Sequence, residues 1–228
     1  MNSVDTTAFR PRALAPEERF RALARAVDPN ALLDHQALAR VRSMLWTKEA
    51  SLRPIVISAV TDAERRAVPV LFDTVGQVQR RLPEHLAPVL LLCGVVAGPA
   101  SPRPTDVLFV PEPGVDGRPL LFAVADAFLA ASPETTTATY EAMATALPVI
   151  GTTGGSLEKD IVNGGYDANG WLADEGDSGA LVAALVQACL YRPERMRRGT
   201  AAAEYVRTVL EQRRPPADDP SRTPGAAA

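Results

Sequence analysis

Residues 125–177 alternate apolar runs of strand length with stretches of helical pattern, and this alternation limits the possible folds more than any other feature of the chain. Residues 127–130 and 148–152 are predicted strands, and residues 134–146 between them are a predicted helix. A further helix follows, capped by Asp177 or Ser178. Strand, helix and strand in this order form the unit from which parallel sheets covered by helices are built.

The same alternation extends upstream. Residues 55–59, 89–93 and 107–110 are short apolar runs, and the run at 89–93 has no polar alternation, as in a strand covered on both faces. Apolar side chains recur at helical spacing through residues 68–82, and a last helix is expected from Pro193 to about residue 212. We therefore predict an α/β fold with a doubly wound, mostly parallel Rossmann-like sheet.

Changes in composition divide the chain into four segments. Residues 1–12 are short and polar, and residues 13–52 carry apolar side chains at three- and four-residue spacing on both sides of an Asp-Pro-Asn turn, which predicts a helical insertion. Residues 53–212 form the predicted Rossmann-like domain. Residues 213–228 are rich in proline, aspartate and alanine, so we expect a disordered tail.

Composition argues against several classes of function. The formal net charge is −3, which disfavours nucleic acid as a main partner. His35 and His85 are the only histidines, so neither a histidine metal site nor a Ser-His-Asp triad is expected. Cys93 and Cys189 lie in apolar stretches and are predicted to be buried thiols of a reduced, cytoplasmic protein. Apolar runs are short and charges interrupt the N-terminus, so we expect no stable membrane span and no signal peptide.

Three motifs together carry a family resemblance. They are Tyr-Glu-Ala-Met-Ala at 140–144, Leu-Pro-Val-Ile-Gly-Thr at 147–152 and Gly-Gly at 154–155. The chain resembles the C-terminal, donor-binding half of retaining GT-B glycosyltransferases of the family-4 type. The resemblance implies transfer of a sugar from a nucleoside-diphosphate-sugar to an acceptor with retention. It also implies that the nucleotide-sugar is the bound small molecule, with no metal and no other cofactor.

Two glutamates are candidate site residues. A carboxylate accepts two hydrogen bonds at once, which suits the vicinal hydroxyls of a ribose, and the resemblance implies this role for Glu141. It implies a catalytic role beside the donor sugar for Glu134. The alternatives are a surface glutamate for Glu141 and, for Glu134, an acid that interacts with the helix dipole. The two are one residue closer together than is usual in the family, and one residue turns a helical side chain by about 100°.

The donor diphosphate has its own candidate residues. Unpaired N–H groups at a helix N-terminus bind phosphate, so the backbone of Thr135 and Thr136 is a candidate, although the glycine that the family normally carries there is absent. Gly154 and Gly155 are candidates for a loop near the nucleotide, and a tight structural loop is the alternative.

A cation is also expected after the first strand. The resemblance aligns Arg65 with a lysine that neutralises the diphosphate, and an exposed arginine at a helix start is the alternative. Val60 stands where the family carries a second cation, an arginine, so this part of the expected site is incomplete.

The extent of the resemblance raises a second hypothesis. Residues 2–11 are similar to the segment that joins the two halves of such enzymes, so the acceptor-binding half is expected from a separate acceptor-domain protein or from a second copy in a homo-oligomer. A truncated gene product is a further alternative. The alternative is a catalytically inactive GT-B-like domain that binds a nucleotide or a partner. A dinucleotide-dependent enzyme is disfavoured, because no Gly-x-Gly-x-x-Gly follows the first strand.

Overall fold

The sheet of this protein is parallel throughout. The computed structural model describes residues 4–27, 39, 42, 43, 45, 53–94, 106–110 and 117–212. Within these residues a six-stranded sheet has the order β3-β2-β1-β4-β5-β6. Its strands are β1 (Ile55–Ala59), β2 (Val89–Cys93), β3 (Val107–Val110), β4 (Ala127–Leu129), β5 (Val149–Thr152) and β6 (Gly170–Ala173). This is a doubly wound α/β fold, as predicted.

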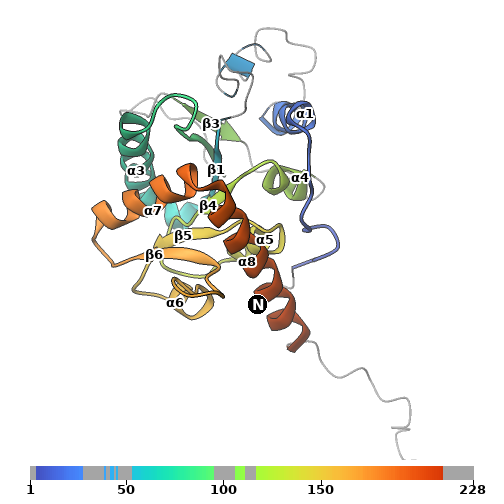
Figure 1. Ribbon diagram of the computed structural model, residues 1–228, viewed down its shortest axis with the longest axis vertical. Coiled ribbons are helices and arrows are strands. Elements are labelled where there is room, and N and C mark those ends of the chain that lie inside the picture. Colours follow the sequence, from blue (N-terminus) through green and yellow to red (C-terminus); the bar gives the residue numbers. More distant parts are fainter. Residues whose placement is uncertain are drawn as a thin grey trace, which may run out of the picture.

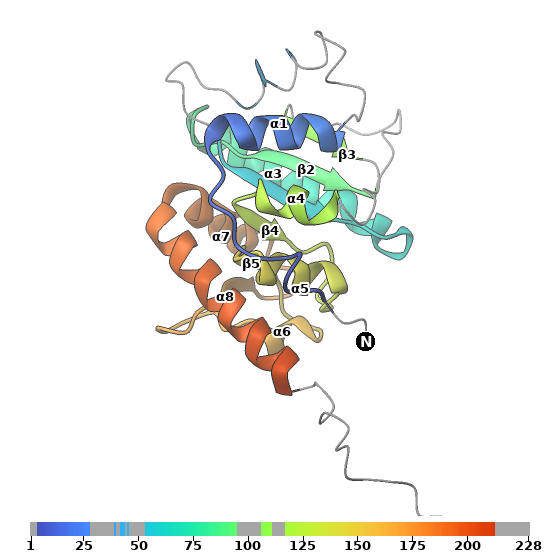
Figure 2. The ribbon, with the colours of Figure 1, turned by 90° about the vertical axis from the view of Figure 1, so that its right-hand side faces the viewer.

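Helices cover both faces of the sheet (Figure 1). One layer consists of α1 (Pro16–Val27), α4 (Arg118–Ala123), α5 (Thr137–Ala144) and α8 (Arg192–Gln212). The other consists of α3 (Val68–Arg81) and α7 (Ser178–Leu190). A 3-10 helix, η1 (Asp62–Ala67), precedes α3, and the short α6 (Leu157–Asp160) follows β5. Figure 2 shows α8 running beside α5, on which it packs.

Alternating side chains divide the core into two halves. Ile55 and Ile57 of β1 pack under α4 and α5, whereas Val56 between them packs under α3 and α7. Both faces are therefore apolar, which explains why the strands read as continuous apolar runs. Cys93 and Cys189 are buried and free, as predicted, and burial raises the pKa of the Cys189 thiol to about 12.

The elements differ from the prediction mainly at their ends. The predicted helix over 134–146 begins only at Thr137, because Thr136 caps it and accepts a hydrogen bond from Thr139 N. The strand β6 was not predicted, since it is short and begins with a glycine. The predicted insertion at 13–52 contains α1, but most of 28–52 lies outside the described residues, as does the predicted tail at 213–228.

The strand order creates a crevice at one edge of the sheet. From β1 the chain moves outward through β2 and β3, then crosses back to place β4 on the other side of β1. The loops after β1 and β4 therefore leave in opposite directions, and ligands of such sheets bind between them, beyond the carboxyl ends of the strands. None of the helices that the structure describes has the length and apolar character needed to cross a bilayer.

Candidate functional site

A cavity of about 430 Å³ lies at this crevice. The loops after β1 and β2, the start of α4 and the first turn of α5 enclose it. Its lining residues are Ala59, Val60, Thr61, Asp62, Glu64, Gly94, Arg118, Thr136, Thr137 and Ala138. The cavity therefore lies where the topology of the sheet predicts a ligand site.

Glu141 lies just behind this cavity. Although it is charged, it is only 7 % exposed, because α5 packs it against α4. Its Oε2 accepts a hydrogen bond of 2.7 Å from Nε of Arg118, which itself lines the cavity. The alternative of a surface glutamate is therefore wrong. The role of Glu141 as a ribose ligand stays a prediction.

Glu134 lies in the loop between β4 and α5. Its Oε2 accepts hydrogen bonds from the hydroxyl of Ser156, at 2.5 Å, and from the backbone N–H of Ser156, at 3.2 Å. The Ser156 hydroxyl, aided by this N–H, lowers the pKa of Glu134, so the carboxylate is ionised at neutral pH. Glu134 is not among the residues that line the cavity.

Gly154 and Gly155 shape the loop after β5. Gly154 has a φ of +102°, and its N–H donates to the carboxylate of Glu158. A Cβ on Gly155 would lie 2.5 Å from the carbonyl oxygen of Pro133. Both glycines are therefore required for the close packing of two loops. This agrees with the alternative of a tight structural loop. A further contact with a nucleotide stays a prediction.

The N–H groups of Thr135 and Thr136 have partners within the protein. Thr135 N donates to Ser156 Oγ at 2.8 Å, and Thr136 N donates to Thr139 Oγ1 at 3.2 Å. Neither is open to a phosphate in this structure. Thr137 and Ala138, the first two residues of α5 after the N-cap Thr136, line the cavity.

Arg65 does not line the cavity. Its side chain is 59 % exposed and forms an ion pair of 2.8 Å with Asp62 on η1. Val60, which replaces the expected arginine, does line it. Among the described lining residues the cation is Arg118, which sequence reasoning missed because it lies outside the three family motifs.

Asp160 is a second residue that sequence reasoning missed. It is buried, and three hydroxyl groups from different segments donate to it: Thr135 at 2.6 Å, Tyr140 at 3.1 Å and Tyr205 at 2.8 Å. The Asp160 carboxylate therefore ties the loop before α5, α5 itself and α8 together. Asp160 is the last residue of α6, and its bond with Thr135 holds the loop that carries Glu134.

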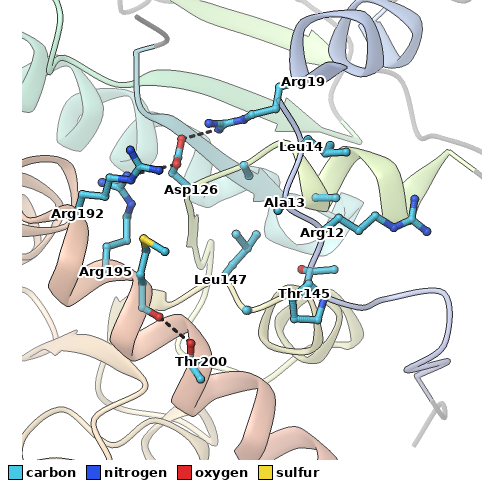
Figure 3. Close-up of a pocket in the computed structure, with 15 residues that line it drawn as sticks. Arg12, Ala13, Leu14, Arg19, Asp126, Thr145, Leu147, Arg192, Arg195 and Thr200 are labelled. Carbon is cyan, nitrogen blue, oxygen red and sulfur yellow. Dashed lines mark hydrogen bonds and ion pairs between the residues drawn. The ribbon is translucent and has the colours of Figure 1, made fainter. Parts of the chain in front are cut away.

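A second cavity, of about 550 Å³, lies before the amino ends of β4 and β5, at the opposite edge of the sheet (Figure 3). Arginines dominate its charged lining. Arg19 and Arg195 both bind Asp126, at 2.7 and 3.3 Å. Arg19 also donates to the carbonyl of Val124, and Arg195 to that of Ala188. Because protein groups occupy these two guanidinium groups, we assign them a structural role.

Solved structures share this fold. The C-terminal domain of the glycosyl transferase group 1 protein LpcC from Francisella tularensis matches with a TM-score of 0.60 and 16% identity, over 90% of this chain and 97% of that one. Sucrose-phosphate synthase from Thermosynechococcus elongatus matches with a TM-score of 0.63 and 17% identity, over 91% of this chain and 47% of that one. The chain thus spans about half the length of that enzyme.

A structure with a bound ligand is also similar. Anabaena HepE in complex with UDP-glucose matches with a TM-score of 0.56 and 16% identity, over 93% of this chain and 52% of that one. No curated protein sequence matches the chain. The family model for glycosyl transferases group 1 matches residues 53–190, more than half of the 228 residues. The chain therefore belongs to the glycosyl transferases of group 1, with the fold of a C-terminal GT-B half.

Proposed function

We propose that this chain is the donor-binding half of a retaining glycosyltransferase of the family-4 type. It would transfer a sugar from a nucleoside-diphosphate-sugar to an acceptor, and the cavity beside β1 and α5 would hold the donor. The observation that carries this proposal is the buried carboxylate of Glu141 behind that cavity. Glu141 is not itself a lining residue, but a buried carboxylate bonded to Arg118 in the wall of a concave site at the carboxyl edge is suited to bind sugar hydroxyls that enter there.

Each site residue has a separate role in this proposal. Glu141 accepts hydrogen bonds from the ribose hydroxyls. Glu134, whose pKa is lowered by the hydrogen bond from the Ser156 hydroxyl, stabilises positive charge on the reacting sugar carbon. Protein cations and helix N–H groups neutralise the leaving diphosphate, so no metal is required.

The chain spans about half the length of the sucrose-phosphate synthase that it matches, and an acceptor-binding half is a further part of the active enzyme in this proposal. We propose a separate acceptor-domain protein or a second copy of this chain as its source, in the cytoplasm where nucleotide-sugars are made. The structure of HepE with UDP-glucose supports a nucleotide-sugar as the ligand of this fold.

A catalytically inactive nucleotide-binding or partner-binding domain is the second candidate function. Three observations favour it: Arg65 lies outside the cavity, Val60 lines it, and the acids Asp62 and Glu64 stand in its wall. Such a domain would bind the nucleotide without cleaving the bond between sugar and phosphate.

Calorimetric titration of the full chain with UDP-glucose and GDP-mannose tests the proposal. We expect saturable binding of one of them, weakened about 10- to 100-fold in Glu141→Gln, because the amide presents one acceptor oxygen where the carboxylate presents two. Glu204→Gln, an exposed change on α8, is the matched control and should bind normally. Binding of neither donor contradicts the proposal. Binding without release of nucleoside diphosphate, even with an added acceptor domain, supports the inactive alternative.

A further inference from the structure

The position of Arg118 in the donor cavity suggests a role that the sequence did not indicate. Among the lining residues that the structure describes, Arg118 is the one basic side chain. It belongs to the first turn of α4, whereas Asp62 and Glu64 in the same lining belong to η1. The cation of this site therefore comes from a different element than the loop after β1.

Contacts with Glu141 and Phe122 hold Arg118 in place. Its Nε donates to Glu141 at 2.7 Å, and its guanidinium carbon lies 5.8 Å from the centre of the buried Phe122 ring. The side chain is 22 % exposed, against 59 % for Arg65. A fixed cation at a partly buried position interacts more strongly with an anion than a mobile one in water, because solvent screens it less.

The first turn of α5 lies in the wall of the same cavity. Thr137 and Ala138 line it, and the N–H groups of the first turn of a helix have no acceptor within that helix. A guanidinium group together with such N–H groups is a combination that binds phosphate oxygens.

The two acids in the cavity wall are already bound to protein donors. Asp62 pairs with Arg65, and Glu64 accepts hydrogen bonds from Thr61 and Ser132. These partners hold both carboxylates in place and reduce their repulsion of an incoming anion.

We propose that Arg118, and not Arg65, is the side chain that binds the diphosphate of the donor. The identity of the ligand as a nucleoside diphosphate rests on the proposed function, whereas the preference for a phosphate group rests on the cavity itself. Because Arg118 also holds Glu141, it joins the phosphate-binding part of the site to the carboxylate proposed for the ribose.

Calorimetry with matched ligands tests this assignment in the full chain. Dissociation constants for UDP and uridine, and for GDP and guanosine, give a ratio that isolates the contribution of the two phosphates. We expect Arg118→Gln to reduce this ratio about 10- to 100-fold, the value of a lost charge-assisted hydrogen bond. Arg118→Lys should retain part of it. The exposed control Arg207→Gln should leave it unchanged.

Arg118→Gln leaves the buried Glu141 without its cation, which can unfold the protein. The double variant Arg118→Gln/Glu141→Gln removes both charges. When the ratio of dissociation constants in this double variant is compared with the ratio in Glu141→Gln alone, the difference gives the contribution of Arg118 in a protein that has no charge at position 141. A ratio unchanged by the loss of Arg118, or reduced equally by Arg65→Gln, overturns the inference.

Titration with inorganic pyrophosphate distinguishes this inference from the proposed function. If pyrophosphate binds and its binding requires Arg118, while no nucleotide binds, this inference stands and the proposed function fails. If pyrophosphate and all the nucleotides fail to bind, both fail.

Discussion

At the scale of single residues, Ser58 is a polar side chain at a position surrounded by apolar ones. It lies in the middle of β1, opposite Leu92 of β2, and is fully buried. Its hydroxyl has no hydrogen-bond partner among the described residues. Its neighbours on the same face of the sheet, Val56 and Leu90, belong to the apolar core under α3 and α7. A hydroxyl buried in this way loses its bonds to water and gains none in return.

We expect Ser58→Ala to raise the free energy of unfolding by about 1 kcal/mol, because it removes an unsatisfied polar group and leaves only a small void. Urea denaturation followed by circular dichroism measures the change. Thr145→Val is the contrasting control, since the Thr145 hydroxyl donates to the carbonyls of Glu141 and Ala142 and its loss should destabilise the fold. A lower stability of Ser58→Ala would mean that the hydroxyl has a partner after all.

At the scale of elements, the first turn of α8 is fastened by Glu194. Its carboxylate accepts hydrogen bonds from Arg197 and Arg198, and the guanidinium carbon of Arg198 lies 4.3 Å from the centre of the Trp171 ring on β6. Hydrogen bonds from Arg197 and then Arg198 lower the pKa of Glu194 to about 2. Glu194 thus positions the cation that joins α8 to the edge of the sheet.

This shift predicts a pH-dependent contribution to stability. The pKa of Glu194 is about 2 in the folded protein and 4.5 in the unfolded chain, so the ionised carboxylate stabilises the folded protein above pH 4.5. This stabilisation is lost as the pH falls through about 2. We expect Glu194→Gln to cost about 1 kcal/mol at pH 7, a value reduced because the side chain is partly exposed. The difference from the wild type should shrink between pH 4.5 and 2 in denaturation curves measured across this range. A difference that stays constant down to pH 2 would show that the charge is not responsible.

Asp126 fastens three elements at the amino edge of the sheet. It binds Arg19 of α1 and Arg195 of α8, and it accepts a hydrogen bond from the N–H of Ile55 at the start of β1.

Breaking the largely buried ion pairs of Asp126 leaves its arginines without a counter-charge. We expect Asp126→Asn to lower the free energy of unfolding by about 2–3 kcal/mol, as measured by urea denaturation. Asp62→Asn, which breaks the exposed pair with Arg65, should change it by less than about 0.5 kcal/mol. Equal effects of the two changes would exclude a special role for Asp126.

Most elements could be predicted because their apolar periodicity reports burial. The strands at 55–59 and 89–93 and the helix at 68–82 carry enough apolar residues to define their period. The strand β6 could not be predicted, because its Gly170 is selected by packing: a Cβ there would lie 2.3 Å from the carbonyl oxygen of Val149. Local sequence does not encode such a constraint between neighbouring strands.

At the scale of the whole molecule, the two edges of the sheet are built differently. Each edge holds a cavity: in the cavity at the amino edge Asp126 pairs with Arg19 and Arg195, whereas the cavity at the carboxyl edge lies between β1 and α5. Sequence reasoning located the carboxyl edge and Glu141, because strand ends and a family motif mark them. It could not find Arg118, because the contact of α4 with α5 depends on helix packing and not on spacing along the chain.

A ligand that binds only the folded protein stabilises it, so the cavity should couple donor binding to the stability of the entire sheet. At a concentration of UDP about 100 times its dissociation constant, we expect a gain of about 2.7 kcal/mol, which corresponds to a rise in Tm of about 5–10 °C for a domain of this size. Differential scanning calorimetry measures the shift, with uridine at the same concentration as the matched ligand. If the phosphates contribute most of the affinity, uridine should produce a much smaller shift, and Arg118→Gln/Glu141→Gln should respond weakly to both. Equal shifts with UDP in this variant and in the wild type would place the bound nucleotide elsewhere on the molecule. The site at the β1–β4 crossover would then have lost the charges of Arg118 and Glu141 without any effect on UDP binding.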